Sequence, residues 1–313
     1  MRMRQVGSSG LAVSLLGVGC NNFGRRLDAA GAARVVHAAT DSGITLFDTA
    51  DIYGGGASEE ILGAAVRDRR DRVVIATKFG GAMGEDWSKR GASRRWIRHA
   101  VEDSLKRLGT DHIDLYQLHF PDPATPIDET LETLDALVSA GTVRYIGSSN
   151  FAGWEIADAA WTARHRSLTP FISAQNEYSL LERGVEQEVL PACRRFRIGL
   201  IPYFPLASGV LTGKYARGKQ PGPETRLGRI GDRSRLTERN LSIVDRLREF
   251  TTSRGVGLLD VAIGWLAANP LVSSVIAGAM SPEQIAINVA ASEWQPSAED
   301  LDQIDTITTP ATN

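Results

Sequence analysis

The chain has 313 residues, of which 42% are hydrophobic and 23% charged, and its formal net charge is −2. These values are typical of a globular protein and exclude a long disordered chain or a membrane protein. A charge this close to zero gives no general attraction to nucleic acid, so we expect neither a nucleic-acid nor a membrane partner. Cys20 and Cys193 belong to no CxxC or Cys/His spacing, which predicts free thiols, no metal site and a cytoplasmic location.

The first residues predict a short β-hairpin and not an export signal. "RMRQV" (2–6) and "LAVS" (11–14) flank the turn "GSSG" (7–10), and the strand "LLGVG" (15–19) follows. Two arginines before an apolar stretch and Cys20 resemble a lipidation signal, but Gln5 and the turn interrupt the apolar run.

The rest of the chain alternates between short apolar runs and helical patterns. Including the first, the predicted strands cover 15–19, 44–48, 72–78, 112–118, 142–147, 170–175, 198–203 and 272–276. Helical periodicity covers 28–42, 57–68, 93–108, 127–140, 151–165, 183–197 and 258–268. Strands this apolar are buried on both faces, which indicates a parallel sheet covered by helices. Eight such units predict a closed (β/α)₈ TIM barrel.

One long irregular segment, 207–236, follows the seventh predicted strand and is rich in Gly, Arg and Pro. Loops of this length in a compact domain are usually functional or mobile. No composition change marks a linker, so the sequence predicts a single domain over 1–313.

Polar side chains collect at the carboxyl ends of the predicted strands, the end at which TIM barrels hold their active sites. They are Asp48 with Tyr53, Lys78, His119, Ser148 to Asn150, Gln175 and Tyr203. Each has an ordinary explanation by itself, such as a turn residue or a buried core side chain. An acid, a tyrosine, a lysine and a histidine above one barrel mouth together indicate catalysis.

This set of side chains suits the reduction of a carbonyl group. A tyrosine acts as an acid at neutral pH only with help, and the ammonium of Lys78 favours its ionised form. Asp48 would keep the buried lysine charged, and His119 would hydrogen-bond a carbonyl oxygen. No side chain donates hydride, so a nicotinamide cofactor is implied.

Five segments resemble the aldo-keto reductase family, and the resemblance covers almost the whole chain. The segments are "LFDTADIYGGGASEEILG" (46–63), "VVIATK" (73–78), "IDLYQLH" (113–119), "GTVRYIGSSNF" (141–151) and "PYFPLASGVLTGKY" (202–215). The resemblance implies a (β/α)₈ barrel that binds NADPH across its carboxyl-terminal face and reduces aldehydes or ketones. It assigns the catalytic tetrad to Asp48, Tyr53, Lys78 and His119.

The same resemblance implies a set of cofactor contacts. Ser149, Asn150 and Gln175 would hold the nicotinamide carboxamide, Tyr203 would stack on the ring, and Arg226 would fold over the dinucleotide. The adenosine end would lie at "VIAGAMSPEQIAINV" (275–289). The full set is Gly19, Cys20, Asn21, Ser149, Asn150, Gln175, Tyr203, Phe204, Pro205, Leu206, Ser208, Lys214, Arg226, Gly278, Met280, Ser281, Gln284 and Asn288.

Two positions depart from the family pattern: Met280 replaces a common basic residue, and Ile287 replaces a common acid. Both changes affect the adenosine end, so we predict NADPH with NADH as the alternative. Asn22, Phe23, Trp87 and Phe120 are the predicted contacts to a small carbonyl substrate. The sequence identifies neither that substrate nor the oligomeric state. Two other functions stay open, a cofactor-binding regulatory subunit like the potassium-channel β-subunits and a different TIM-barrel enzyme.

Overall fold

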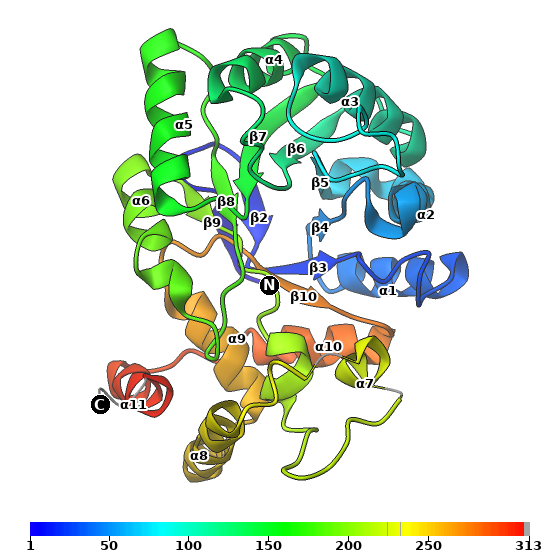
Figure 1. Ribbon diagram of the computed structural model, residues 1–313. Helices are drawn as coiled ribbons and strands as arrows, with labels where there is room; N and C mark the ends of the chain where they lie inside the picture. Colours follow the sequence, from blue (N-terminus) through cyan, green and yellow to red (C-terminus); the bar gives the residue numbers. More distant parts are fainter. Residues whose placement is uncertain (224, 232, 310–313) are drawn as a thin grey trace.

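A parallel sheet curls around the centre of the molecule in this computed structural model, which describes residues 1–223, 225–231 and 233–309 (Figure 1). Its strands are β3 (Leu16–Gly19), β4 (Leu46–Asp48), β5 (Val74–Phe79), β6 (Ile113–Leu118), β7 (Val143–Ser149), β8 (Ser173–Gln175), β9 (Gly199–Leu200) and β10 (Val275–Gly278). They pair in the order β10-β3-β4-β5-β6-β7-β8-β9. A bridge between Leu200 and Val272, and a hydrogen bond of 3.0 Å from the Ile276 N–H to the Pro202 carbonyl, close the ring. The predicted TIM barrel is confirmed.

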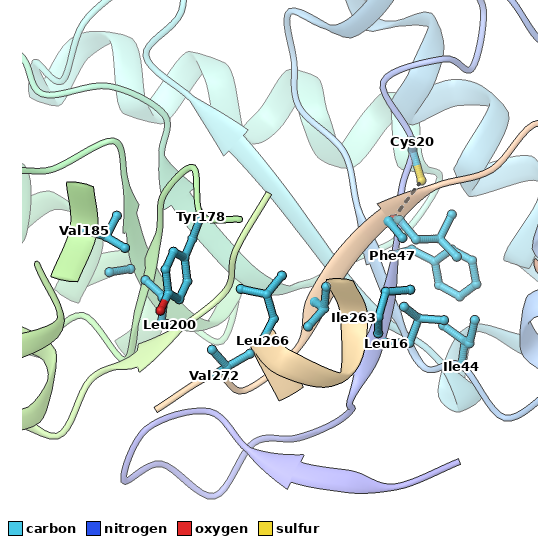
Figure 2. Packing of buried hydrophobic residues seen from close by; sticks show 14 of the residues in the cluster. Leu16, Cys20, Ile44, Phe47, Tyr178, Val185, Leu200, Ile263, Leu266 and Val272 are labelled. Carbon is cyan, nitrogen blue, oxygen red and sulfur yellow. Dashed lines mark hydrogen bonds between the residues drawn. The ribbon is translucent and has the colours of Figure 1, made fainter. Parts of the chain in front are cut away.

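Helices form the outer layer of the barrel (Figure 1). They are α1 (Ala29–Asp41), α2 (Ala57–Val66), α3 (Arg94–Leu108), α4 (Ile127–Ser139), α5 (Gly153–Arg166), α6 (Val189–Phe196), α9 (Leu258–Ala268) and α10 (Pro282–Ala291). Between the strands and this layer lies the main apolar core. Figure 2 shows part of it, with Leu16 and Phe47 from the strands beside Ile263 of α9.

The hairpin predicted at the start of the chain closes one end of the barrel. Its strands β1 (Met3–Gln5) and β2 (Ala12–Ser14) pair antiparallel. Val6 and Val13 pack with barrel residues such as Leu46 and Leu115 in a second apolar cluster. The Arg4 guanidinium donates hydrogen bonds to the carbonyls of Ala267, Asn269 and Val272 at 2.5, 3.1 and 2.7 Å. The hairpin is therefore tied to the end of α9 and to the segment that leads into β10.

Prolines explain two differences between predicted and observed boundaries. The strand predicted at 198–203 ends at Leu200, because Pro202 has no N–H with which to continue a ladder. The helix predicted at 183–197 begins only at Val189, after a 3₁₀ turn at Gly184–Glu186, because Pro191 fits only the first turn of a helix. The last predicted strand, 272–276, is displaced to Val275–Gly278, where it pairs with β3 from Leu16 onward.

Like α10, three further helices lie outside the helical ranges predicted from the sequence. They are α7 (Arg226–Ile230), α8 (Glu238–Arg254) and α11 (Ala298–Thr308). The short α7 lies within the predicted irregular segment 207–236, of which Glu224 and Asp232 are outside the described residues, as are residues 310–313 of the predicted domain. Among the described residues, the helices are too short or too polar to cross a membrane.

We expect Gly63→Ala to destabilise the fold, because α2 lies against the end of α3 at this residue. A Cβ on Gly63 would lie 2.1 Å from the backbone oxygen of Leu108. Overpacking against backbone costs about 1–3 kcal/mol, so the midpoint of urea unfolding falls. Gly109→Ala is the control, because Gly109 has a φ of +62° but nothing within 4 Å. The alanine at position 109 therefore costs only the roughly 1 kcal/mol of a left-handed backbone conformation. Equal losses in the two variants would contradict the packing argument.

Candidate active site

The segment between β4 and α2 places Tyr53 at the barrel mouth. The N–H of Asp51 donates to the Lys78 carbonyl at 3.2 Å, and the N–H of Tyr53 donates to the Ala50 carbonyl at 3.1 Å. Gly54, Gly55 and Gly56 follow with φ values of 63°, 66° and 102°. Only glycine adopts such values without strain, so the three glycines let the chain turn directly into α2.

A buried ion pair joins the neighbouring strands β4 and β5. Lys78 Nζ lies 2.7 Å from Asp48 Oδ2 and donates a second hydrogen bond of 2.9 Å to the Thr49 carbonyl. The Lys78 side chain is 0% exposed and that of Asp48 is 4% exposed. On β8, Gln175 Nε2 donates to Asp48 Oδ1 at 2.8 Å. Burial alone would lower the pKa of Lys78, but Asp48 and Tyr53 raise it above its ordinary value. The lysine is therefore charged.

Tyr53 lies between this ion pair and His119. The Lys78 ammonium is 5.1 Å from the centre of the phenol ring, and the Tyr53 and His119 rings meet edge to face at 5.9 Å. Burial raises the pKa of Tyr53, whereas the charge of Lys78 lowers it, and the net direction is upward. The phenol is therefore protonated at neutral pH, and the nearby cation stabilises the phenolate that forms if it gives up its proton.

His119 follows β6 and is neutral. Its ring stacks on that of Phe120, with the centroids 4.3 Å apart and the planes 6° apart. Burial, and then the charge of Lys78, lower the pKa of His119 to about 3. Its Nδ1 is buried with no hydrogen-bond partner among the described residues. The imidazole can therefore hydrogen-bond a ligand without taking up a proton.

Asn150 connects this group to the other side of the barrel. Its Nδ2 donates to the His119 carbonyl at 2.9 Å, and its Oδ1 accepts from the Tyr203 hydroxyl at 2.7 Å. Asn150 has a φ of 62°, and Phe204, Ala207 and Ser208 are also left-handed, at 52°, 45° and 59°. Strained backbone of this kind concentrates at functional sites.

A cavity of about 1070 Å³ opens above these residues. Most of the predicted site residues line it: Gly19, Asn21, Asn22, Asp48, Tyr53, His119, Phe120, Ser149, Asn150, Gln175, Tyr203, Phe204, Pro205, Leu206, Ser208, Lys214, Arg226, Gly278, Met280, Gln284 and Asn288. Residues from the strand ends, the long loop and α10 thus share one space. Among the described residues, the structure has no group of three His, Cys, Asp or Glu side chains suited to a metal ion.

Five predicted residues do not line this cavity. Lys78 and Phe23 are fully buried, the first below the cavity at Asp48 and the second in the core. Cys20 is also buried, its thiol points to the Val18 carbonyl (Figure 2), and burial raises its pKa well above the usual range. Trp87 is 81% exposed in a turn held by Asp86. Ser281 instead caps α10, accepting from the Gln284 N–H at 3.4 Å.

Several cavity residues were missed by sequence reasoning. They are Arg26, Gly209, Thr212, Thr225, Arg229, Arg248, Thr251, Thr252, Gly257, Leu258 and Leu259, whereas Ile276, Ala277 and Ile287 also line the cavity but belong to the segment 275–289 predicted for the adenosine end. The basic composition of the long loop was a signal for Arg229. Arg26 could be recognised only in three dimensions. Its pKa is lowered by burial and then by the charges of Arg229 and Arg226, which approach it from another part of the chain.

Comparisons with known proteins identify the family of the chain. A sequence model described as the aldo/keto reductase family matches residues 15–309. The chain belongs to this family. It is 39% identical to the uncharacterized oxidoreductase YrpG of Bacillus subtilis. The alignment has 304 residues and covers 94% of this chain and 91% of the Bacillus protein. The versiconal hemiacetal acetate reductase of Aspergillus parasiticus is 36% identical and covers 86% of each chain.

A plant relative carries a different name. The probable voltage-gated potassium channel subunit beta of Oryza sativa is 38% identical to this chain, over 98% of it and 96% of the rice protein. The aldo/keto reductase scaffold therefore includes both oxidoreductases and proteins named as channel subunits. Members of the family generally use nicotinamide cofactors.

A second, smaller cavity of about 150 Å³ lies behind the Tyr53 turn, and Asp51, Trp96 and Arg107 are among its lining residues. Asp51 is 1% exposed, its Oδ1 accepts from the Ile52 N–H at 2.7 Å, and its Oδ2 has no partner among the described residues. Burial, and then the carboxylate of Glu59, raise the pKa of Asp51 to about 7. Asp51 is therefore protonated below neutral pH.

We expect Asp51→Asn to stabilise the protein, and to do so more at high pH. The pKa of this carboxyl is near 4 in the unfolded chain and about 7 in the folded protein. Its contribution to the free energy of unfolding is therefore fully present below about pH 4 and is lost as the pH rises through about 7. The amide of the asparagine variant does not titrate, so the variant loses no stability over this pH range. Between about pH 5.5 and 8.5 the variant should gain about 2 kcal/mol over the wild type, measured by urea unfolding. A gain independent of pH would show that Asp51 does not titrate in this range.

Proposed function

We propose that this chain reduces aldehydes or ketones to alcohols with NADPH, NADH being the alternative cofactor. The observation that carries the proposal is the buried Lys78–Asp48 ion pair, with Tyr53 and His119 beside it at the floor of the large cavity. Family membership supports an oxidoreductase.

Tyr53 would give its proton to the oxygen of the reduced carbonyl. Burial keeps the phenol protonated until that step, and Lys78 then stabilises the phenolate. Asp48 holds Lys78 charged, with its other oxygen satisfied by Gln175. A neutral His119 would hydrogen-bond the carbonyl oxygen and position it beside Tyr53.

The cavity fits a dinucleotide in size and in the chemistry of its walls. At about 1070 Å³ it is at the upper end of the range for ligand pockets and exceeds the needs of a small carbonyl compound. Arg26, Lys214 and Arg226 line it, and Arg226 Nε is buried without a partner among the described residues. These cations suit phosphate groups. When bound, the nicotinamide supplies the hydride.

The contacts of the predicted cofactor residues refine their roles. Gln175 already donates to Asp48, so its carbonyl oxygen is the atom that would meet the carboxamide. Gln284 Oε1 accepts from the Met280 N–H at 2.8 Å, and Ser281 caps the same helix. With these groups engaged, we assign most of the phosphate recognition to the arginines. Asn22 and Phe120 would contact the substrate, and the cytoplasm would be the place of action.

A regulatory subunit is the second candidate, and the similarity to the rice channel subunit favours it. Such a protein would bind the dinucleotide through the same cavity and respond to its oxidation state. Steady-state oxidation of NADPH with a panel of aldehydes and ketones separates the two. Repeated turnover supports the reductase, whereas binding followed by no more than one turnover supports the regulatory subunit.

We expect Tyr53→Phe to retain cofactor affinity and to lower kcat by about 10²–10⁴-fold, the usual contribution of a positioned general acid. Fluorescence titration with NADPH gives the affinity, and aldehyde-dependent NADPH oxidation gives kcat. Trp87→Phe is the matched control, because this ring is 81% exposed and does not line the cavity. A near-normal kcat in the Tyr53 variant would remove Tyr53 from the proposed role.

We expect the wild type to prefer NADPH modestly and Met280→Arg to increase that preference. Met280 lines the cavity at the start of α10, where an arginine would add a charge-assisted hydrogen bond to the 2′-phosphate. The test is kcat/KM for both cofactors at one ionic strength, because salt screens such contacts. An unchanged ratio would show that the 2′-phosphate does not lie at this helix start.

A further inference from the structure

Phe204 is an unusual residue at the edge of the large cavity. It has a φ of 52°, a left-handed conformation that bulky residues rarely adopt. Its ring meets that of Tyr203 edge to face, with the centroids 5.1 Å apart. The guanidinium of Arg226 lies 4.7 Å from the centre of the Phe204 ring, and that of Arg235 lies 5.5 Å from it. One aromatic side chain thus contacts two arginines of the long loop.

The Arg226 guanidinium lies in surroundings that disfavour its positive charge. Burial lowers the pKa of Arg226, and the positive charges of Arg235 and Arg25 lower it further. Its Nε is buried with no hydrogen-bond partner among the described residues, although the side chain lines the cavity. The ring face of Phe204 offsets part of this cost, because a cation is attracted to the negative face of an aromatic ring. Arg235 is also fixed from the other side by an ion pair with Glu177.

We propose that Phe204 is a positioning residue, which holds Arg226 in the cavity, ready for a phosphate group, before the cofactor binds. The inference rests on the proposed function, because the phosphate belongs to the dinucleotide. A long flexible side chain loses conformational entropy when it binds, and a side chain that is already ordered loses less. Phe204 therefore contributes to affinity through Arg226 and needs no polar contact of its own.

The position of Phe204 also relates the loop to the reacting groups. Its neighbour Tyr203 donates to Asn150, and Asn150 donates to the His119 carbonyl. The loop that carries Arg226 is thereby packed, through Phe204, on the segment that supports His119. The same chain of contacts therefore supports both the position of the loop and the position of His119.

A double-mutant cycle tests the proposal. Phe204→Leu keeps an apolar side chain and the same backbone demand but removes the ring face, whereas Phe204→Tyr keeps the ring face. We expect Phe204→Leu to weaken NADPH binding on the order of five- to tenfold, the size of a partly buried cation–π contact. Phe204→Tyr should restore affinity. In an Arg226→Met background, Phe204→Leu should have no further effect. Additive losses in the double variant would overturn the proposal.

A measurement without cofactor separates this inference from the proposed function. In the cofactor-free protein, hydrogen exchange over residues 225–231 should be faster in Phe204→Leu than in the wild type and unchanged in Phe204→Tyr. Equal exchange in all three proteins would overturn the positioning role, even if NADPH binds. If the wild type binds neither NADPH nor NADH, the proposed function fails, and with it the phosphate role of Arg226.

Discussion

The ion pair between Lys78 and Asp48 is the constraint around which the rest of the site is arranged. Two charges removed from water lose their hydration, and only close pairing with further hydrogen bonds repays that cost. The Thr49 carbonyl and Gln175 supply those bonds. The ion pair joins the neighbouring strands β4 and β5, whereas Gln175 on β8 reaches Asp48 from across the interior of the barrel. The chemistry of the site therefore depends on the closed fold, because an open sheet would leave Asp48 without its hydrogen bond from Gln175.

The pattern of the sequence was sufficient for the barrel because each strand is an apolar run and most helices are clearly amphipathic. It was insufficient for α8, in which "ERNLSIVDRLREF" carries charges around most of the helix, and at Pro202, where the apolar run continues beyond the ladder. Strand ends share one face of a barrel by geometry, so the meeting of Tyr53, Lys78 and His119 followed from the topology alone.

Loop side chains could not be placed in the same way. Trp87 has the composition expected of a pocket wall, yet a local turn directs it to solvent, and Phe23 belongs to the core. Arg26 meets Arg226 across about two hundred residues of chain, a distance over which no periodic pattern operates. The direction of a loop side chain depends on contacts that form only after folding. The walls of the cavity were accordingly less predictable than its floor.

The N-terminal hairpin has a consequence for how the molecule is made. The carbonyls to which Arg4 donates, from Ala267 to Val272, leave the ribosome more than two hundred residues after Arg4 itself. Val6 and Val13 can already pack on Leu46 and Leu115 by then, but the edge of β3 that pairs with β10 has no partner yet. Contacts this distant in sequence slow folding and leave strand edges exposed to wrong pairing. The barrel is thus completed only once β10 has been made, and a ribosome-bound chain lacking β10 would retain an open edge.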